Sequence, residues 1–538
     1  MLFSVQCEVI DSDLLNDPNA ASLDNVDPDF LLNNVQIFTQ EIYSNASTYG
    51  AEVSRMRYMF GSTYGNADDF TPQAFDLNRL YEESYSDMLI DVENLIPIAE
   101  ERELYFHSGM AKTLKAYVLI TLVDLFGDVP FSEALDAENF NPGLDDGQDI
   151  YNTALGLLDE AIADFQNENR RAFPQNDLFY SGHTGDAKVD AWVRAANTIK
   201  LKAYLNTGNT SEINSLISSG NLILTNANNF TFDFSSNDVN PDSRHPEFID
   251  TYINLPSGGN YMAVNYLNFM LNDKNQRDPR TRYYFYRQST SNPTDANENT
   301  CIGASKPGHF DEADPFCLLS DGYWGRDHLI DDGIPPDAGL RTTFGVYPVG
   351  GQFDANQGQS VTPGMGYQGA GFEPFMMASY THFMLAEAAQ NLGAQGNPRE
   401  YLRTALELSF EAVLGYGAAQ AAGSGFEPSE GAVNTYINTV VDDRFDSQGP
   451  MRTINKEYYL ALWPNGIETY NLLRRTGFGN RNHPDKLQPA RANNPGDWYR
   501  TLSYPSDLID RNSNVGPKDN RRVGPFWDPN NGSEEFNF

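Results

Sequence analysis

The segment between residues 110 and 131 restricts the possible folds more than any other part of the chain. It reads MAKTLKAYVLITLVDLFGDVPF and is apolar at nearly every position from Ala116 to Phe126. A helix with this sequence has no polar face, so it must be buried on several sides. Gly127 suits the left-handed position just beyond a helix end, and Pro130 prevents further helix. The segment therefore predicts a helix inside a stack of other helices.

Helical patterns dominate the chain up to about residue 220. Asp27 followed by Pro28 is typical of a helix start, and the pattern predicts a helix that reaches about Glu41. The other helices predicted in this part are Leu77–Ala99, Leu104–Phe126, one opened by Asp149 and ending at Phe165, and one from Asp190 to Leu205 that stops at Gly208. Two more are predicted late in the chain, at Phe375–Leu392 and, after an Asn397 cap, at Arg399–Gly415.

The order of these patterns predicts the fold class. Consecutive helices with alanine-rich faces are typical of tetratricopeptide-like hairpins, although no strict repeat of about 34 residues is visible. Asn228–Glu373 instead has almost no helical periodicity and is rich in Gly, Pro, Asn and Tyr. We therefore predict a mainly α fold of tetratricopeptide-like hairpins with a long, loop-rich insertion that contains short strands. The predicted organisation is a tether at 1–26, a helical scaffold at 27–227, a ligand-binding insertion at 228–374, and a C-terminal helical part with an irregular tail at 375–538 that packs into one domain with the scaffold.

Charge and hydropathy restrict the partners. The chain has 36 Lys and Arg against 74 Asp and Glu, a net charge of −38. Such a surface repels phosphate backbones and anionic lipids, so we expect no nucleic-acid partner. No apolar run reaches the roughly 18 to 20 residues that a membrane-crossing helix needs. Contact with a membrane is therefore expected only through an anchor.

The sequence lacks the common catalytic motifs: HExxH, GxSxG, a Walker loop and CxxC do not occur. Residues 364–369 match GxGxxG, but no strand pattern precedes them and no helix pattern follows, so no dinucleotide loop is predicted. Asp145-Asp146 and Asp331-Asp332 lack the alternating spacing of a calcium loop and are interpreted as solvated turns. We predict no cofactor and no metal. Because 74 acids supply many carboxylate pairs, a secreted glycoside hydrolase remains an alternative.

The three cysteines suggest an exported protein. Cys7 follows the short apolar stretch LFSVQ and precedes an acidic segment, which is typical of a lipoprotein acylation site with its tether. Gln6 departs from the small residue usual before such a cysteine, and a free thiol is the alternative. Cys301 and Cys317 flank a loop rich in Gly, Pro and Asp, and in an oxidising compartment they are predicted to pair. Two free thiols are the alternative.

The loop-rich insertion carries the most suggestive binding chemistry. Aromatic residues stand there among Asn, Asp and Arg. Carbohydrate sites combine flat aromatic faces, which cover the C–H side of a sugar, with polar groups that bond its hydroxyls. We predict that the ligand lies on loops of the insertion and on Met59–Phe70; the predicted stacking residues are Tyr64, Tyr283, Tyr323 and Trp324, and the predicted polar partners are Arg326 and Asp327. The alternative is that these aromatics pack the loops together.

Five segments along the chain carry recognisable motifs. They are residues 110–131, the helix Asp190–Ala203 with Trp192, the Ala-Glu-Ala helix Phe383–Gly393, the element Asn455–Gly477, and Tyr504-Pro505 followed by Asn512. In this order they resemble motifs of the SusD/RagB family of outer-membrane nutrient-binding lipoproteins. The sequences NGIE at 465–468 and RRTG at 474–477 are most similar to the RagB-related branch.

This resemblance implies a SusD-like α/α superhelix and a function. Members of such a family are non-enzymatic lipoproteins on the outer face of the outer membrane of Bacteroidetes, and they pass glycans or peptides to a TonB-dependent SusC-like transporter. We therefore expect a cell-surface receptor for an oligosaccharide, anchored by lipid at Cys7. A peptide receptor on the same fold is the alternative. The five motifs belong to the scaffold, so the resemblance assigns no ligand-contacting residue.

Overall fold

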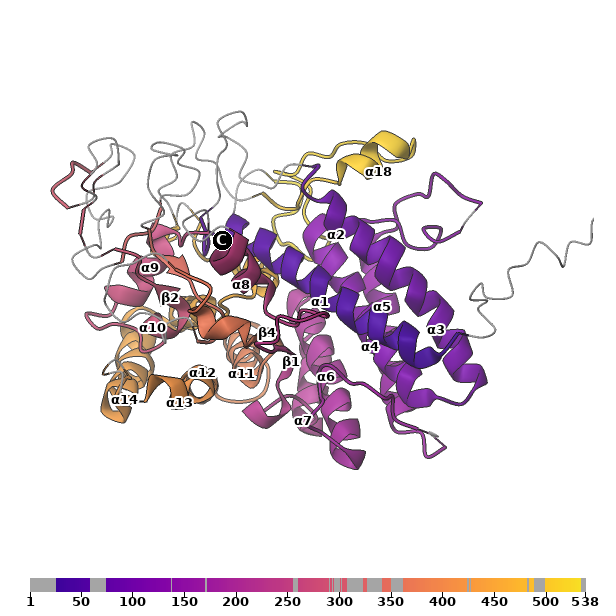
Figure 1. Ribbon diagram of the computed structural model, residues 1–538, viewed down its shortest axis with the longest axis horizontal. Helices are drawn as coiled ribbons and strands as arrows, with labels where there is room; N and C mark the ends of the chain where they lie inside the picture. The colour runs from indigo at the N-terminus through magenta and orange to yellow at the C-terminus, as the bar shows by residue number, and fades with distance from the viewer. Residues whose placement is uncertain are drawn as a thin grey trace, which may run out of the picture.

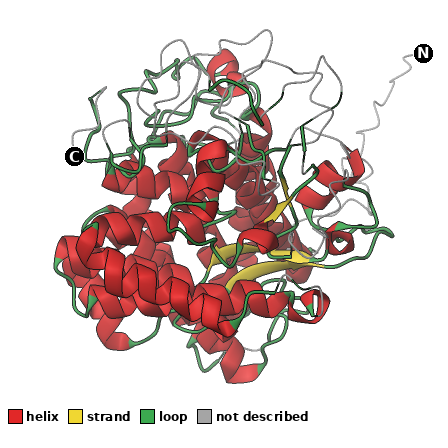
Figure 2. Cartoon of the chain, turned by 90° about the vertical axis from the view of Figure 1, so that its left-hand side faces the viewer, coloured by secondary structure: helices red, strands yellow, loops and turns green. Residues whose placement is uncertain are grey.

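The computed structural model confirms a mainly helical fold. It describes residues 26–58, 74–136, 138–169, 172–254, 260–289, 291–292, 294, 300, 302–306, 323–326, 341–349, 361–422, 425, 427–480, 483–487 and 499–533. Within these ranges helices predominate, and the strands form two two-stranded sheets (Figures 1 and 2).

The central helix predicted from the sequence is α4 (Tyr105–Phe126), and every one of its residues after Tyr105 is buried. It packs against α1 (Pro28–Val53) and α5 (Gly147–Phe165). It ends at Gly127, whose φ of 79° is a conformation that residues with a side chain rarely adopt. The apolar residues of α4 therefore lie in the middle of the hydrophobic core.

The N-terminal half contains every helix predicted there, with corrected ends, and one further helix at Thr210–Ser219. Besides α1, α4 and α5 the helices of this half are α2 (Asn78–Glu82), η3 (Glu83–Leu89), α3 (Ile90–Glu101), α6 (Gly185–Asn206) and α7 (Thr210–Ser219). Asp27 caps α1 as predicted, because its Oδ1 accepts a hydrogen bond of 3.0 Å from the N–H of Asp29. Helix α1 continues beyond Glu41 to Val53, because its later residues pack with small and polar side chains such as Ala46 and Ser47, which form no apolar stripe.

Two helices begin earlier than predicted. The N-cap of α5 is Asp146 and not Asp149: its side chain accepts a hydrogen bond of 2.8 Å from the N–H of Gln148. Helix α6 begins at Gly185, before the predicted start at Asp190. The first turn of α6 is largely exposed, and in α5 the first two residues after Gly147 are exposed and polar, so the hydrophobic period does not mark the first residue of either helix.

The insertion contains more helix than the sequence indicated. Its elements, with the turn before it, are η4 (Asn226–Asn228), β1 (Phe230–Phe234), α8 (Pro246–Phe248), η5 (Ile249–Asn254), α9 (Val264–Leu271), α10 (Thr281–Tyr284), β2 (Phe285–Tyr286), β3 (Thr343–Phe344), η8 (Gly366–Gly369) and β4 (Gly371–Met376). Helix α9 has eight residues, six of them apolar and buried, and so short an apolar segment does not separate helix from strand in the sequence. The GxGxxG match at 364–369 overlaps the 3₁₀ turn η8, directly ahead of strand β4.

Both sheets are antiparallel and small. Strand β1 pairs with β4, with Phe232 opposite Glu373, and β2 pairs with β3. The predicted helix Phe375–Leu392 is corrected here: Phe375 and Met376 belong to β4, and the helix begins at Ala378. The apolar residues at the start of the predicted helix pack equally well in a buried strand, and the sequence does not separate a strand from a helix there.

The C-terminal part adds a second group of helices. They are α11 (Ala378–Glu387), η9 (Ala388–Leu392), α12 (Pro398–Tyr416), α13 (Ala418–Ala421), α14 (Glu430–Asn438), η10 (Thr439–Arg444), α15 (Phe445–Ser447), α16 (Pro450–Ala461), α17 (Gly466–Thr476) and α18 (Ser506–Arg511). Asn397 caps α12 as predicted. Helix α17 crosses α1, so the C-terminal helices pack directly on the N-terminal ones. One core cluster contains residues of both groups.

The tail after residue 499 covers the end of α4. The backbone N–H of Leu502 donates to Leu125 O at 2.8 Å, and the hydroxyl of Tyr504 donates to Asp128 O at 2.7 Å. The ammonium group of Lys518 donates to Phe126 O. Carbonyl groups in the last turn of a helix have no partner within the helix. The tail, largely irregular as predicted, supplies those partners.

Asp124, near the end of α4, joins several of the five motif segments. Its carboxylate accepts hydrogen bonds from Asn471 Nδ2 at 2.7 Å and from Trp527 Nε1 at 3.0 Å. It also lies 3.1 Å from Lys202 Nζ, which is 2.6 Å from Glu468. Burial acts to lower the pKa of Lys202, but Glu468 and Asp124 outweigh it and raise that pKa above its usual range. Lys202 therefore stays charged and links α6, α4 and α17 in the interior.

Candidate functional site

The chain that follows α1 meets three distant segments in what we call the bridged cluster, residues 56–58, 261–263, 323–326 and 341–344. Isolated β-bridges pair Arg57 with Met262, Tyr261 with Thr343, and Ala263 with Arg326. The N–H of Arg326 donates to Met262 O at 2.9 Å, and the N–H of Thr342 donates to Trp324 O at 2.8 Å. Backbone hydrogen bonds thus hold the four segments in register and fix where their side chains begin.

Arg57 is the inner cation of the bridged cluster. Its guanidinium donates to Glu247 Oε2 at 3.0 Å and to Thr48 Oγ1 at 2.9 Å, and it lies 4.2 Å from the ring centroid of Phe344. Burial raises the pKa of Glu247, and Arg57 opposes that shift. Burial, with Arg57 nearby, lowers the pKa of His245 to about 3. The charges of Arg57 and Glu247 are paired with each other, and His245 is buried beside them, so we assign these three residues a structural role.

Arg326, one of the predicted polar partners, lies between two tyrosines. Its Nη1 donates to the hydroxyl of Tyr58 at 3.1 Å. The guanidinium carbon lies 5.2 Å from the Tyr58 ring centroid and 5.7 Å from that of Tyr261. Guanidinium groups are attracted to the faces of aromatic rings at such distances. The side chain of Arg326 is therefore held in a buried aromatic setting.

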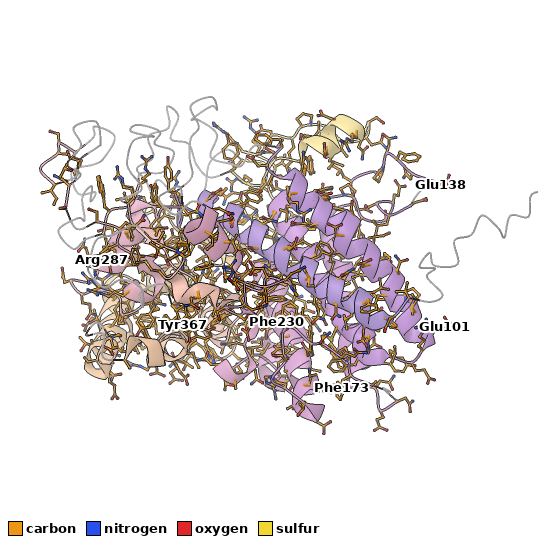
Figure 3. The ribbon with its side chains drawn as sticks, viewed as in Figure 1. Glu101, Glu138, Phe173, Phe230, Arg287 and Tyr367 are labelled. Atoms are coloured by element: carbon orange, nitrogen blue, oxygen red, sulfur yellow. The ribbon has the colours of Figure 1, made fainter. Side chains whose placement is uncertain are left out.

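Trp324 and Tyr323 are also covered by arginines. The guanidinium carbon of Arg341 lies 3.6 Å from the Trp324 ring centroid, and those of Arg277 and Arg287 lie 5.3 Å and 5.0 Å from the Tyr323 ring centroid. Trp324 is 3% exposed and Tyr323 is 0% exposed. Figure 3 places Arg287 toward one end of the molecule, far from Glu101 of α3. In this conformation arginine side chains lie over both rings, and the stacking role of Tyr323 and Trp324 stays a prediction.

Tyr283 lies apart from these residues. It is 2% exposed, and a β-carbon on Gly417 would lie 3.6 Å from its Cε1. Burial raises the pKa of its hydroxyl. The structure therefore brings Tyr323, Trp324 and Arg326 together and places Tyr283 against the end of α12, where its ring too is not open to solvent.

The remaining predicted positions are Tyr64, Asp327, Cys7, Cys301, Cys317 and the loop Met59–Phe70; all of them lie outside the described residues. For these the ligand, lipidation and disulfide roles stay predictions. The prediction missed Arg57, Tyr58, Tyr261 and Arg341. They belong to no motif and meet only because three distant segments pair, a contact that no local pattern in the sequence signals.

In the part of the chain that the structure covers, no group of three His, Cys, Asp or Glu residues is placed to hold a metal ion. Asp145, a residue considered for calcium, accepts from the backbone N–H groups of Phe131 and Ser132 at 2.8 Å and 3.0 Å. Among the helices that the structure describes, none is both long and apolar enough to span a membrane.

Solved structures show the same fold. A SusD/RagB family protein from Bacteroides thetaiotaomicron has a TM-score of 0.66 at 18% identity and covers 91% of this chain and 95% of its own. A SusD homologue from Bacteroides fragilis has a TM-score of 0.64 at 19% identity, covering 95% and 98%. A chitin-binding SusD homologue from Flavobacterium johnsoniae has a TM-score of 0.60 at 16% identity, covering 93% and 97%.

The sequence itself matches a family model. Residues 18–323, more than half of the 538, match the SusD-like family described as starch-binding and associating with the outer membrane. No curated protein sequence matches the chain. The match includes α1 to α10, and the structural neighbours extend the likeness to the C-terminal helices. The chain therefore belongs to the SusD-like family.

Proposed function

We propose that this protein is a non-enzymatic cell-surface receptor that binds an oligosaccharide and delivers it to a TonB-dependent SusC-like transporter in the outer membrane. The observation that carries this proposal is the match of residues 18–323 to a family described as starch-binding and associating with the outer membrane. The chitin-binding SusD homologue among the structural neighbours supports a glycan ligand.

A lipid at Cys7 holds the receptor at the membrane. Mass spectrometry of the N-terminal peptide from native membranes tests whether Cys7 carries a lipid.

We place the ligand at the bridged cluster. Three of the predicted contact residues, Tyr323, Trp324 and Arg326, stand there, and Arg326 lies beside Tyr58 and Tyr261. Arg341 covers the face of Trp324 at 3.6 Å, so a sugar ring reaches this face only when Arg341 turns away. Arg341 is buried and its Nη1 donates to Gly325 O at 3.1 Å, so this hydrogen bond must break when the side chain turns away.

Calorimetry with starch-derived and chitin-derived oligosaccharides tests the ligand class. We expect one series to bind, and we expect Trp324→Ala to weaken that binding at least about tenfold, since an aromatic contact to a sugar face is lost. Phe140→Ala is the matched control, because Phe140 is 81% exposed and lies outside the bridged cluster. Trp324 is buried, so the melting temperature of each variant is measured, and binding is compared where both variants remain folded.

Three results would contradict the proposal. Unchanged affinity in folded Trp324→Ala would remove the ligand from the bridged cluster. Binding of peptides in place of every glycan would make the protein a peptide receptor. Release of reducing sugars from a polysaccharide by the pure protein would make it a glycoside hydrolase.

Co-purification of the protein with a TonB-dependent transporter from native membranes tests the partner. If no such transporter co-purifies at mild detergent concentration, the result counts against delivery.

A further inference from the structure

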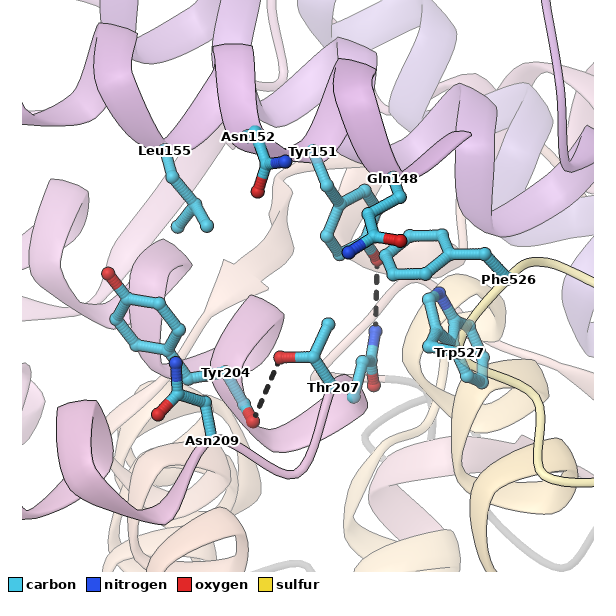
Figure 4. A pocket seen from close by; sticks show the side chains of 10 residues that line it. Gln148, Tyr151, Asn152, Leu155, Tyr204, Thr207, Asn209, Phe526 and Trp527 are labelled. Atoms are coloured by element: carbon cyan, nitrogen blue, oxygen red, sulfur yellow. Dashed lines mark hydrogen bonds between the residues drawn. The ribbon is translucent and has the colours of Figure 1, made fainter. Parts of the chain in front are cut away.

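A second site of distinct chemistry lies away from the bridged cluster, between α5, α6 and the tail. It is a cavity of about 570 Å³, within the roughly 300 to 1,000 Å³ of pockets that accept small molecules. Figure 4 shows Tyr204 on one side and Phe526 and Trp527 on the other, with Asn152 above the space between them. We propose that this cavity binds a neutral sugar unit, such as the end of an oligosaccharide.

The charge of the lining supports a neutral ligand. None of the 10 residues that line the cavity is charged, although the chain has 74 acidic and 36 basic residues. A phosphate or a carboxylate would find no cation in this lining and would lie near the buried carboxylate of Asp124. An ammonium group would find no anion in the lining. Burying an unpaired charge is strongly unfavourable, so an uncharged ligand fits best.

The polar side chains of the lining match hydroxyl groups. Gln148 and Asn152 are exposed on α5, and within the described part of the chain their side-chain amides make no hydrogen bond. An amide presents a donor and an acceptor side by side, and a hydroxyl is both donor and acceptor. Tyr204, Phe526 and Trp527 supply apolar ring surface across the cavity. Rings facing amides are the combination that binds the two sides of a sugar.

The floor of the cavity is held in place from below. Tyr151 donates its hydroxyl to Asp124, and Trp527 Nε1 donates to the same carboxylate at 3.0 Å. Asn206 Nδ2 donates to the Tyr151 hydroxyl at 3.2 Å, and its Oδ1 accepts from Arg475 at 2.6 Å. The rings of Tyr151 and Phe526 meet edge to face at 5.0 Å. These fixed orientations reduce the ordering that a ligand must impose when it binds.

Calorimetry with maltotriose and with diacetylchitobiose on the full chain tests the cavity. The double variant Gln148→Ala/Asn152→Ala removes two exposed amides that hold no other described residue by a hydrogen bond, so folding should be unchanged. We expect its affinity for the bound probe to fall about tenfold, because two neutral hydrogen bonds are lost. Leu155→Trp, which places a large ring at the wall, should abolish the same binding. Thr153→Ala, on α5 outside the lining, is the matched control.

The outcomes separate this proposal from the proposed function. Two binding events for the same probe, one lost in the cavity variants and the other lost in Trp324→Ala, support a second sugar site. Affinity unchanged in both the double variant and Leu155→Trp overturns it, and so does the absence of binding of either probe at millimolar concentration. Binding of a neutral peptide in the cavity, with no sugar, also overturns it. The proposed ligand site at the bridged cluster is tested separately, by the oligosaccharide affinity of Trp324→Ala.

Discussion

Glu373, on strand β4, is a carboxyl group that the interior keeps protonated. Its side chain is 3% exposed and accepts a hydrogen bond of 3.1 Å from Gln40 Nε2. Burial raises its pKa to about 8. In the unfolded chain a glutamate loses its proton near pH 4.3. Between about pH 4.3 and 8 the folded state therefore holds one more proton than the unfolded state, and this group makes the free energy of unfolding fall as pH rises.

Glu373→Gln should remove this dependence. Glutamine keeps the acceptor for Gln40 and carries no proton to lose. We expect the variant to match the parent near pH 4 and to gain on it by about 1 kcal/mol of unfolding free energy per pH unit up to about pH 8. Chemical denaturation at pH 5 and pH 8 measures the gain. Glu138→Gln, at an exposed position, is the control. An equal effect of Glu373→Gln at both pH values would show that the carboxyl is ionised in the fold.

Among elements, α1 and α17 cross with their backbones in close approach. A β-carbon on Gly466 would lie 1.9 Å from Ser47 O and 2.1 Å from Ala51 N, and one on Gly50 would lie 2.3 Å from Gly466 O. The backbones themselves meet there. The motif NGIE thus has a physical reading: Asn465 caps α17, Gly466 permits the crossing, and Glu468 reaches Lys202.

Gly466→Ala should therefore force the two helices apart. Overpacking in a core costs about 1 to 3 kcal/mol and occasionally more, and we expect a loss at the upper end, because backbone atoms cannot turn aside as a side chain does. Gly156→Ala is the matched control: Gly156 is exposed on α5 with nothing within 4 Å, and the change should stabilise by about 0.5 to 1 kcal/mol. The melting temperatures of both variants, compared with that of the parent protein, measure these changes. A melting temperature unchanged by Gly466→Ala would contradict the crossing.

The elements also show what the sequence allows one to predict. Helix α4 was predictable because a helix with apolar residues on all sides must lie in the interior. The starts of α1 and α12 were predictable because Asp27 and Asn397 are typical N-cap residues, and both cap their helices in the structure. Helix α9 was not, since a short apolar segment has no period that separates helix from strand. The candidate site was predictable only in part: Trp324 and Arg326 stand together in the sequence, whereas Arg341 and Tyr261 join them through tertiary pairing alone.

On the scale of the whole molecule, the tail from residue 499 completes a core built by the first helices. It supplies Trp527 to Asp124 and Leu502 to the last turn of α4. A chain ending at residue 498 should lose the cooperative thermal transition, because a buried carboxylate and helix-end carbonyls lose their partners. Adding a peptide of residues 499–533 should restore the transition. Scanning calorimetry of the fragment, alone and with the peptide, measures this, and an unchanged transition without the tail would contradict it.

The dependence of α4 on the tail also bears on the order in which a newly made chain folds. Synthesis runs from the N-terminus, so the ribosome releases α4 long before Trp527 exists. Until then Asp124 lacks one of its hydrogen-bond donors, and the helix end stays open to water. Native closure of this helix end is thereby postponed until residues 499–527 have been synthesised, because they carry the donors that complete it.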